Sequence, residues 1–214
     1  MEPVTTITGR ATVYPGANVD TDEIIPARFL YRDRKDGFAD TLFHDLRLDH
    51  NGDERPEFVL NKPDLRDPQI LVAGQNFGCG SSREHAVWAL LDSGIRCVVA
   101  VSFGDIFRNN AIENGLLPVV MKDDQVAALS DSVSAAAPCE MTVDLAQQTV
   151  RSPDGTTFTF DFEAGAKAAL LAGFNSIDLT IARMDEIMTF EDAYRHSTAW
   201  IFEPNPSITT KQQS

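Results

Sequence analysis

Hydrophobic and polar positions follow a strand–helix alternation in the middle of the chain. Three short apolar runs indicate buried strands, and the segments between them have the pattern of helices. The expected strands are residues 70–74, 96–102 and 117–121, and the expected helices are residues 86–91 and 102–115. Strands and helices in such close succession predict a parallel α/β unit, with the site on loops at the carboxyl ends of its strands.

The regions on either side of this unit show a different pattern. One strand is expected over residues 7–13, and a short strand near residues 57–60 is expected within a polar connection. After residue 141 apolar and polar positions alternate, which predicts a small antiparallel sheet. Its strands are expected at residues 141–145, 149–151 and 156–162.

The C-terminal part is expected to be helical over residues 163–172 and over roughly 176–196. Apolar side chains recur at helical spacing in the second helix, and this pattern is more typical of core packing than of a cofactor site. They are Ile177, Ile181, Met184, Ile187 and Met188. We expect one domain over residues 1–202, followed by a frayed tail over residues 203–214.

The charge of the chain limits its partners. Its 214 residues carry a formal net charge of −14, a field that repels nucleic acid and anionic lipid. No apolar run is long enough to cross a bilayer, and the N-terminal residues lack the pattern of a signal peptide. We therefore expect a cytoplasmic protein that binds neither nucleic acid nor membrane.

The cysteines exclude further classes of site. Cys79, Cys97 and Cys139 are widely spaced and odd in number, which argues against a disulfide framework and fits a reducing compartment. No Cys-x-x-Cys occurs, so an iron–sulfur cluster or a zinc site built from this chain alone is not expected.

The loop of residues 76–85 lies between an expected strand and an expected helix. Its glycines allow the backbone to approach a bound group, and a turn that leads into a helix leaves free N–H groups that suit an anion. Arg83 can grip a carboxylate with two hydrogen bonds. Ser81 and Glu84 fit a capping box, and the whole run can equally be a capped helix start with a solvated arginine. The spacing matches neither a Walker loop nor the dinucleotide fingerprint, so nucleotide binding is not expected.

Two other segments contain candidate site residues. In residues 15–26 the acids Asp20, Asp22 and Glu23 suggest a metal loop, but their spacing misses the EF-hand pattern. An Asx turn or a helix cap is the more typical reading, and the functional alternative is that Asp22 faces an arginine in a site. Residues 28–38 form the most basic stretch, which is either an exposed mobile loop or a flap whose arginines reach a substrate.

At this point three motifs in register resemble one family. Residues 76–86, with residues 18–26 upstream and residues 107–110 and 114–118 downstream, are similar to the small subunit of 3-isopropylmalate dehydratase. The likeness covers nearly all of residues 4–202. It implies the swivelling β/β/α domain of aconitase-type hydro-lyases, with a parallel α/β core and a small antiparallel β element.

The resemblance implies a two-subunit enzyme of leucine biosynthesis. The large-subunit partner would hold a [4Fe–4S] cluster, and this chain would bind no cofactor of its own. The implied reaction removes and re-adds water, and so converts 2-isopropylmalate to 3-isopropylmalate through isopropylmaleate.

The resemblance also implies roles for single residues. Ser81 would be the base that takes a proton from carbon, Ser82 and Arg83 would hold a substrate carboxylate, and Asp22 would orient an arginine. Glu84 and His85 are expected to be structural, and Cys79 is given no chemical role.

The flap departs from the family pattern. Bacterial small subunits usually have Thr-Arg-Thr before Gly-Phe, whereas this chain has Arg34, Lys35 and Asp36 before Gly37. Lys35 stands at the usual arginine and lacks its bidentate fork. Either Arg34 makes the substrate contact of the usual arginine through a small shift of register, or the substrate is not 2-isopropylmalate. A relative acting on 2-methylmalate or another alkylmalate is the alternative, and a stand-alone anion-binding module is a further one.

Overall fold

The computed structural model describes residues 1–202 of the chain. These residues fall into two compact units, one from Met1 to Asn175 and a second that begins at Ser176. The sequence analysis expects one domain over residues 1–202, and this stays a prediction. The helices of the second unit contain no buried residue among those described.

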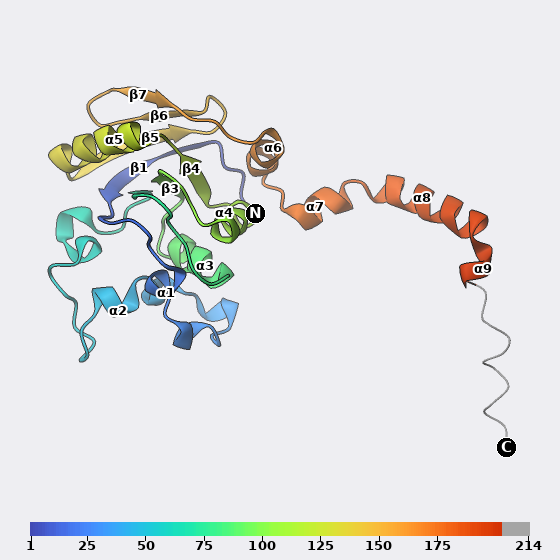
Figure 1. Cartoon of the computed structure of the whole chain (residues 1–214), viewed down its shortest axis with the longest axis horizontal. Helices are drawn as coiled ribbons and strands as arrows, with labels where there is room; N and C mark the ends of the chain where they lie inside the picture. Colours follow the sequence, from blue (N-terminus) through green and yellow to red (C-terminus); the bar gives the residue numbers. More distant parts are fainter. Residues whose placement is uncertain (203–214) are drawn as a thin grey trace, which may run out of the picture. The chain divides into compact units, whose positions relative to one another are not determined.

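The first unit is built on a mixed sheet (Figure 1). Within the described residues its strand order is β4-β3-β2-β1-β5-β6-β7, with β1 to β4 parallel and β5 to β7 antiparallel. The strands are β1 (Thr6–Val13), β2 (Ile70–Val72), β3 (Cys97–Ala100), β4 (Leu117–Val120), β5 (Cys139–Asp144), β6 (Thr149–Arg151) and β7 (Thr157–Thr159). The predicted α/β class, with a parallel core and an antiparallel element, is confirmed, and β1 joins the two parts through its antiparallel pairing with β5.

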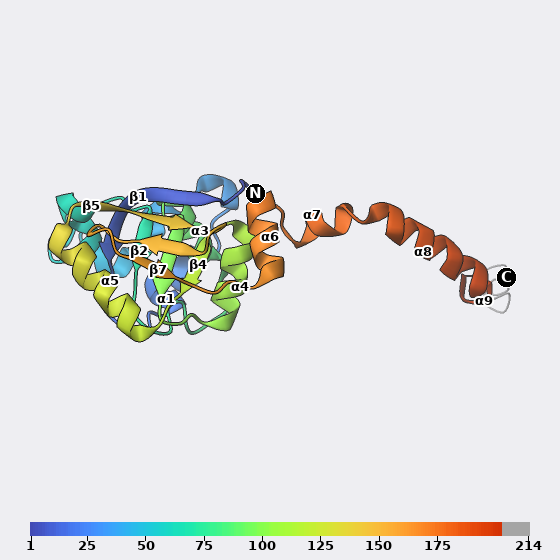
Figure 2. The same ribbon diagram turned by 90° about the horizontal axis from the view of Figure 1, so that it is seen from above.

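Helices cover both faces of this sheet, as Figures 1 and 2 show. The helices α3 and α4 lie on one face and α5 lies on the other. The helices of the unit are α1 (Thr21–Ile24), α2 (His44–Arg47), α3 (Glu84–Asp92), α4 (Asp105–Asn114), α5 (Asp123–Ala136) and α6 (Ala164–Ala172). The sequence analysis predicts no element where α5 lies, although its buried Val126, Leu129 and Val133 recur at helical spacing.

The N-terminal residues are tied to α6 (Figure 2). The N–H of Val4 donates to the carbonyl of Leu170 at 2.8 Å, and the amino group of Met1 donates to the carbonyl of Gly173 at 3.1 Å. These bonds join the N-terminal residues of the first unit to its last helix.

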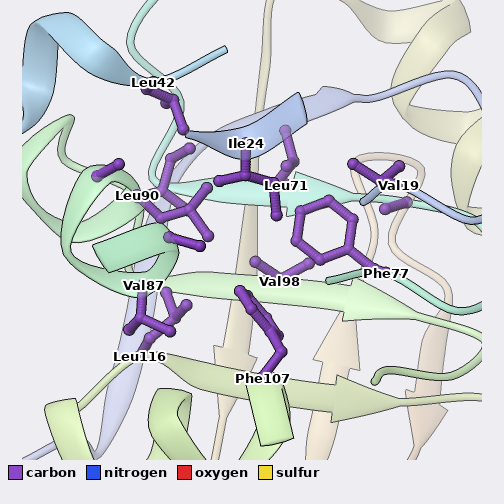
Figure 3. Packing of buried hydrophobic residues seen from close by; sticks show 14 of the residues in the cluster. Val19, Ile24, Leu42, Leu71, Phe77, Val87, Leu90, Val98, Phe107 and Leu116 are labelled. Atoms are coloured by element: carbon purple, nitrogen blue, oxygen red, sulfur yellow. The ribbon is translucent and has the colours of Figure 1, made fainter. Parts of the chain in front are cut away.

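Two hydrophobic clusters fill the space on either side of the parallel strands. Leu71 and Val98 face the cluster under α3 and α4, shown in Figure 3, while Ile70 and Val99 face the cluster under α5. Successive side chains of a strand point to opposite faces, so strands covered on both faces become continuous apolar runs. This is why β2 and β3 stand out in the sequence.

The connection from β1 to β2 contains 3₁₀ turns in place of the expected strand near residues 57–60. Those turns are η1 (Ala27–Phe29), η2 (Arg34–Asp36), η3 (Ala39–Thr41), η4 (Val59–Asn61) and η5 (Pro63–Leu65). The strand prediction was wrong because buried Asn61 organises a turn there, donating to the carbonyls of Arg47 at 2.7 Å and Arg55 at 2.9 Å.

The second unit contains α7 (Ser176–Ile181), α8 (Met184–Ser197) and α9 (Ala199–Phe202). Its apolar side chains are exposed: Met188 is 57% exposed, Phe190 69% and Trp200 75%. The prediction that the helical stripe over residues 177–188 faces a core was therefore wrong for the second unit by itself, because its short helices do not pack against one another so as to bury the stripe. The predicted tail over residues 203–214 lies outside the described residues.

No helix within residues 1–202 is both long enough and apolar enough to span a membrane.

Candidate active site

Three loops meet at the carboxyl edge of the parallel strands, after β1, β2 and β3. Asp20 in the first loop forms an isolated parallel bridge with Cys79 in the second, and Phe77 in the second forms one with Phe103 in the third. The expectation that the two glycine-rich loops, after Ala73 and after Ser102, share one edge of the sheet is therefore confirmed. The site is built where these loops touch.

Main-chain hydrogen bonds fix the loop that follows β2. The N–H of Gly78 donates to the carbonyl of Val19 at 2.8 Å, and the N–H of Thr21 donates to the carbonyl of Cys79 at 2.8 Å. The buried hydroxyl of Thr21 donates to the carbonyl of Ser81 at 2.9 Å. Bonds of this kind leave the loop little freedom, so the residues after Gly80 start from a defined position.

Two glycines are required for this close approach. Gly78 has φ +71°, and a Cβ at this position would overlap the ring of Phe107. Gly80 has φ +89°, and a Cβ there would overlap the carboxylate of Asp20. Only glycine meets both demands, because other residues are strained at positive φ and also carry the Cβ.

The loop ends in a helix start that carries no side-chain cap. The helix α3 begins at Glu84, and its N-cap is Arg83, whose side chain makes no capping hydrogen bond. The predicted capping box of Ser81 and Glu84 was therefore wrong. Ser81 lies two residues too early, with its carbonyl held by Thr21, and the Glu84 carboxylate accepts a hydrogen bond from Asn114 Nδ2 at 2.8 Å.

This helix start leaves a run of hydrogen-bond donors without partners. In the described part of the chain, no acceptor pairs with the backbone N–H groups of residues 80–85. Ser81 and Ser82 are exposed, and their hydroxyls also have no partner within residues 1–202. Free N–H groups together with the positive end of the helix dipole attract an anion.

The guanidinium of Arg83 lies beside the donors. Its Nη1 forms an ion pair with Asp22 of α1 and also lies 3.3 Å from the carbonyl oxygen of Ile25, to which it donates. The Arg83 side chain is only 11% exposed, whereas that of Asp22 is 53% exposed. The structure thus brings Asp22 and Arg83 together, as expected, and the other guanidinium N–H groups have no partner among the described residues.

Asp20, another acid of the first loop, caps a helix. Asp20 is the N-cap of α1, and its Oδ1 accepts a hydrogen bond from the N–H of Asp22 at 2.8 Å. The reading of this segment as an Asx turn or helix cap is confirmed for Asp20. Capping fixes the start of α1 and therefore the direction from which Asp22 meets the arginine.

Arg34 and Lys35 are not brought to the guanidinium of Arg83. Arg34 binds Asp92, which ends the nine-residue helix α3, about 13 Å along the helix from its start. Lys35 pairs with Asp33 at 2.9 Å, and its side chain is 76% exposed. The four remaining predicted site residues, Ser81, Ser82, Arg83 and Asp22, do lie together at the loop.

Sequence reasoning missed two residues that shape this region. Thr21 holds the carbonyl of Ser81, and its only signal was its place between two acids. Asp92 binds the flap, and no pattern marked it, because its partners are more than fifty positions away in the chain. Long-range partners of this kind are visible only in the folded chain.

His85 has a structural environment, as expected. Its ring lies 4.6 Å from that of Trp88 and 5.5 Å from that of Phe38, measured between centroids. Burial lowers the pKa of His85. This burial favours the neutral imidazole, and the aromatic contacts hold the ring against α3.

The described residues contain no group of three or more His, Cys, Asp or Glu placed to hold a metal ion. Cys97 is fully buried in the sheet core, and burial raises the pKa of its thiol. Burial and the nearby Asp20 raise the pKa of the Cys79 thiol as well. Neither cysteine has the electropositive surroundings of a reactive thiolate.

Comparison with known proteins agrees with this geometry. Residues 1–124 match the aconitase C-terminal domain family, and residues 127–164 match the family described as LeuD_N. Together with the loop at the carboxyl edge of the sheet, the match defines the chain as an aconitase-type C-terminal domain.

The relatives are more specific. The chain is 50% identical over 201 residues to the 3-isopropylmalate dehydratase small subunit of Jannaschia sp. (strain CCS1), covering 94% of this chain and 100% of the relative. The same subunit of Dinoroseobacter shibae is 48% identical with the same coverage. The chain belongs to the family of 3-isopropylmalate dehydratase small subunits. A crystal structure of 3-isopropylmalate dehydratase from Methanocaldococcus jannaschii has a TM-score of 0.62 and 28% identity, covering 87% of this chain and 99% of that chain.

Proposed function

We propose that the chain works as the small subunit of a 3-isopropylmalate dehydratase and is active only in complex with a large subunit. The enzyme would convert 2-isopropylmalate to 3-isopropylmalate through isopropylmaleate in leucine biosynthesis. One observation carries the proposal: the uncapped loop of residues 80–85 gathers free N–H groups, two hydroxyls and a guanidinium, on a chain that is 50% identical to a named small subunit.

Arg83 and Ser82 would hold a carboxylate of the substrate. Asp22 takes only Nη1 of Arg83, so the other N–H groups of the guanidinium are available to an incoming carboxylate. Because the aspartate fixes one edge of the guanidinium, the free edge presents its donors in a constant direction. A planar fork held in this way favours two parallel hydrogen bonds to a carboxylate.

Ser81 would take the proton from the substrate carbon next to that carboxylate. The electron pair of the broken C–H bond then forms the C=C double bond while the hydroxyl leaves the neighbouring carbon. A serine hydroxyl is a weak base, and the alkoxide form needs donors around it. The free N–H groups of residues 80–85 and the N-terminal end of α3 supply this stabilisation from fixed positions.

The large subunit would hold a [4Fe–4S] cluster, and this group would supply the Lewis acid that binds the leaving hydroxyl. Residues 1–202 of this chain provide no cluster of ligands that fits such a group. The contribution of this chain is therefore limited to carboxylate binding and to the proton at carbon.

Features of the second unit support a partner chain. Large apolar side chains are exposed on α7, α8 and α9, and exposed apolar surface that forms a patch marks protein–protein interaction sites. The acidic character of the whole chain, with a net charge of −14, opposes nucleic acid and anionic membranes as the partner.

Reconstitution tests the proposal. The purified chain is mixed with its large subunit under anaerobic conditions, and the formation of isopropylmaleate from 2-isopropylmalate is followed by ultraviolet absorbance. We expect turnover in the mixture and none with either chain alone. Binding of the dicarboxylate by the isolated chain, without turnover in any mixture, would instead identify an anion-binding module.

A second candidate is a related hydro-lyase acting on 2-methylmalate, and one observation favours it: Lys35 stands where bacterial small subunits usually have arginine. The reconstituted complex is assayed with isopropyl-, methyl- and unsubstituted malate. The first candidate predicts the highest kcat/KM for isopropylmalate, and the second predicts it for methylmalate. A pocket distinguishes substrates that differ by one methylene by only about 1–3 kcal/mol. The ratios of the three kcat/KM values therefore decide between the two candidate substrates.

A further inference from the structure

One carboxylate holds both ends of the turn at the tip of the flap, the segment of residues 28–38. Asp92 accepts two hydrogen bonds from Arg34, with Nη1 at 2.7 Å and Nη2 at 2.8 Å. The same carboxylate accepts the backbone N–H of Phe38 at 2.8 Å. Between them lies the 3₁₀ turn η2, whose C-cap is Gly37 with φ +71°.

Aromatic packing holds the same turn against α3. The Arg34 guanidinium lies over the ring of Trp88, 5.3 Å from its centroid. Phe38 is fully buried, with its ring 5.6 Å from that of Trp88 and 5.5 Å from that of His85. The Asp92 side chain is only 19% exposed, so water competes weakly for its oxygens.

These contacts give different roles to two of the four cationic residues of the flap, Arg34 and Lys35. Both terminal nitrogens of Arg34 donate to Asp92, so the end-on fork of this guanidinium is occupied and the side chain is held at the C-terminal end of α3. Lys35 carries its charge into solvent, 76% exposed, and its ion-pair partner in the described part of the chain is Asp33, itself 57% exposed. An exposed pair of this kind is weak and exchanges readily.

We propose that Asp92 is a positioning residue that fixes the flap through Arg34 and the N–H of Phe38, and that Lys35 is the flap cation free to meet the anionic substrate. The part concerning substrate rests on the proposed function, whereas the anchoring does not. The sequence left open whether Arg34 or Lys35 takes the place of the usual arginine. The bidentate pair with Asp92 assigns Arg34 to anchoring.

Limited trypsin digestion of the full-length chain tests the anchor without any assay of activity. Cleavage after Arg34 and Lys35 is compared in the wild type, Asp92→Asn, Asp92→Glu and the control Glu54→Gln, which breaks the exposed Arg66–Glu54 pair away from the flap. We expect Asp92→Asn to be cut in the flap about tenfold faster, because proteolysis reports the population of the opened segment. Asp92→Glu, which keeps a carboxylate, restores most of the protection, and Glu54→Gln matches the wild type.

An unchanged rate of flap cleavage in Asp92→Asn would overturn the anchor. Accelerated cleavage throughout the chain would also overturn it, because it would show that Asp92 supports the fold as a whole. Hydrogen exchange of the N–H of Phe38 separates these outcomes, since local opening exposes this amide while the amides of β2 and β3 stay protected.

Kinetics of the reconstituted complex test the division of roles. Lys35→Ala is expected to raise KM about tenfold with a small change in kcat, because the contact is made in both the ground and the transition state. Asp92→Asn raises KM in the same direction, and Lys35→Ala adds little in the Asp92→Asn background, because the two residues act through one segment. If Lys35→Ala leaves KM unchanged while Arg34→Lys raises it, Arg34 is the substrate contact and the proposal fails.

The digestion and the kinetics distinguish failure of the anchor from failure of the proposed function. Absence of turnover in every mixture would count against the proposed function, while the digestion would still decide whether Asp92 anchors the flap.

Discussion

The loop of residues 76–85 leads into α3 and the flap of residues 28–38 packs against α3, but different bonds hold them. Main-chain hydrogen bonds and two glycines that no larger residue can replace fix the loop. Ion pairs of partly exposed side chains fix the flap, namely Arg28 with Asp45, Arg32 with Asp40 and Arg34 with Asp92.

This difference suits two tasks. Main-chain bonds do not respond to salt or pH near neutrality, so the donors of the loop stay in position for a reaction that needs fixed dipoles. Exposed ion pairs such as that of Arg28 with Asp45 are weak and are screened by salt, so the flap is held less firmly than the loop even though Asp92 anchors it. Changes in the loop should therefore have large effects and changes in the flap small ones.

The largest expected effect is that of Ser81→Ala. Loss of a general base lowers turnover by about 10²–10⁴-fold, and the variant should still assemble with the large subunit because the side chain is exposed. The measurement is kcat of the reconstituted complex, with size-exclusion chromatography as the check on assembly. Near-normal turnover would show that Ser81 is not the base.

Gly78→Ala tests the fit of the loop. The new methyl group would overlap the ring of Phe107 at a residue with φ +71°, so the free energy of unfolding should fall by about 2–4 kcal/mol. Gly52→Ala is the matched control, because Gly52 has φ +88° but no atom within 4 Å of its would-be Cβ, and about 1 kcal/mol is expected from backbone strain alone. Urea unfolding measures both, and equal losses would mean that the contact with Phe107 is unimportant.

Arg83→Lys tests the carboxylate clamp. Lysine can keep the contact with Asp22 but cannot offer a second edge, so kcat/KM of the complex should fall about 10–100-fold. Arg66→Lys is a suitable control, since that arginine pairs with Glu54 at the surface. A value within twofold of the wild type would rule out bidentate binding by Arg83.

The smallest expected effect is the response of the flap to acid. The Arg28 guanidinium, hydrogen-bonded to Asp45, lowers the pKa of that carboxyl to about 2. Because the pKa is lower in the folded state, the stabilisation is complete above the ordinary aspartate pKa of about 4 and is lost as the pH falls toward 2.

Carbon-detected NMR of the Asp45 carboxyl between pH 5 and pH 2 measures this directly. We expect the titration midpoint to move up toward the ordinary aspartate value in Arg28→Gln, because its main partner is then gone. A midpoint that is already ordinary in the wild type would mean that this pair does not hold the flap in solution.

The sequence by itself determined the parallel strands, because β2, β3 and β4 are covered on both faces and must be apolar throughout. It also determined the helices after β2 and β3 and the position of the loop of residues 76–85 between a strand and a helix. These patterns are local, and each depends on neighbours within a few positions.

Tertiary structure alone decided the rest. Ser81 fits a capping box locally, yet the bond from Thr21, sixty positions earlier, holds its carbonyl and the helix begins at Glu84. The sequence does not decide whether Arg34 or Lys35 takes the place of the usual flap arginine. In the folded chain Asp92 binds Arg34. The apolar residues of the segment 177–188 have the spacing of a core helix. Spacing identifies the apolar face of a helix, but it does not show whether that face is buried. Whether any surface covers that side depends on chain segments, or partner chains, that no local pattern specifies.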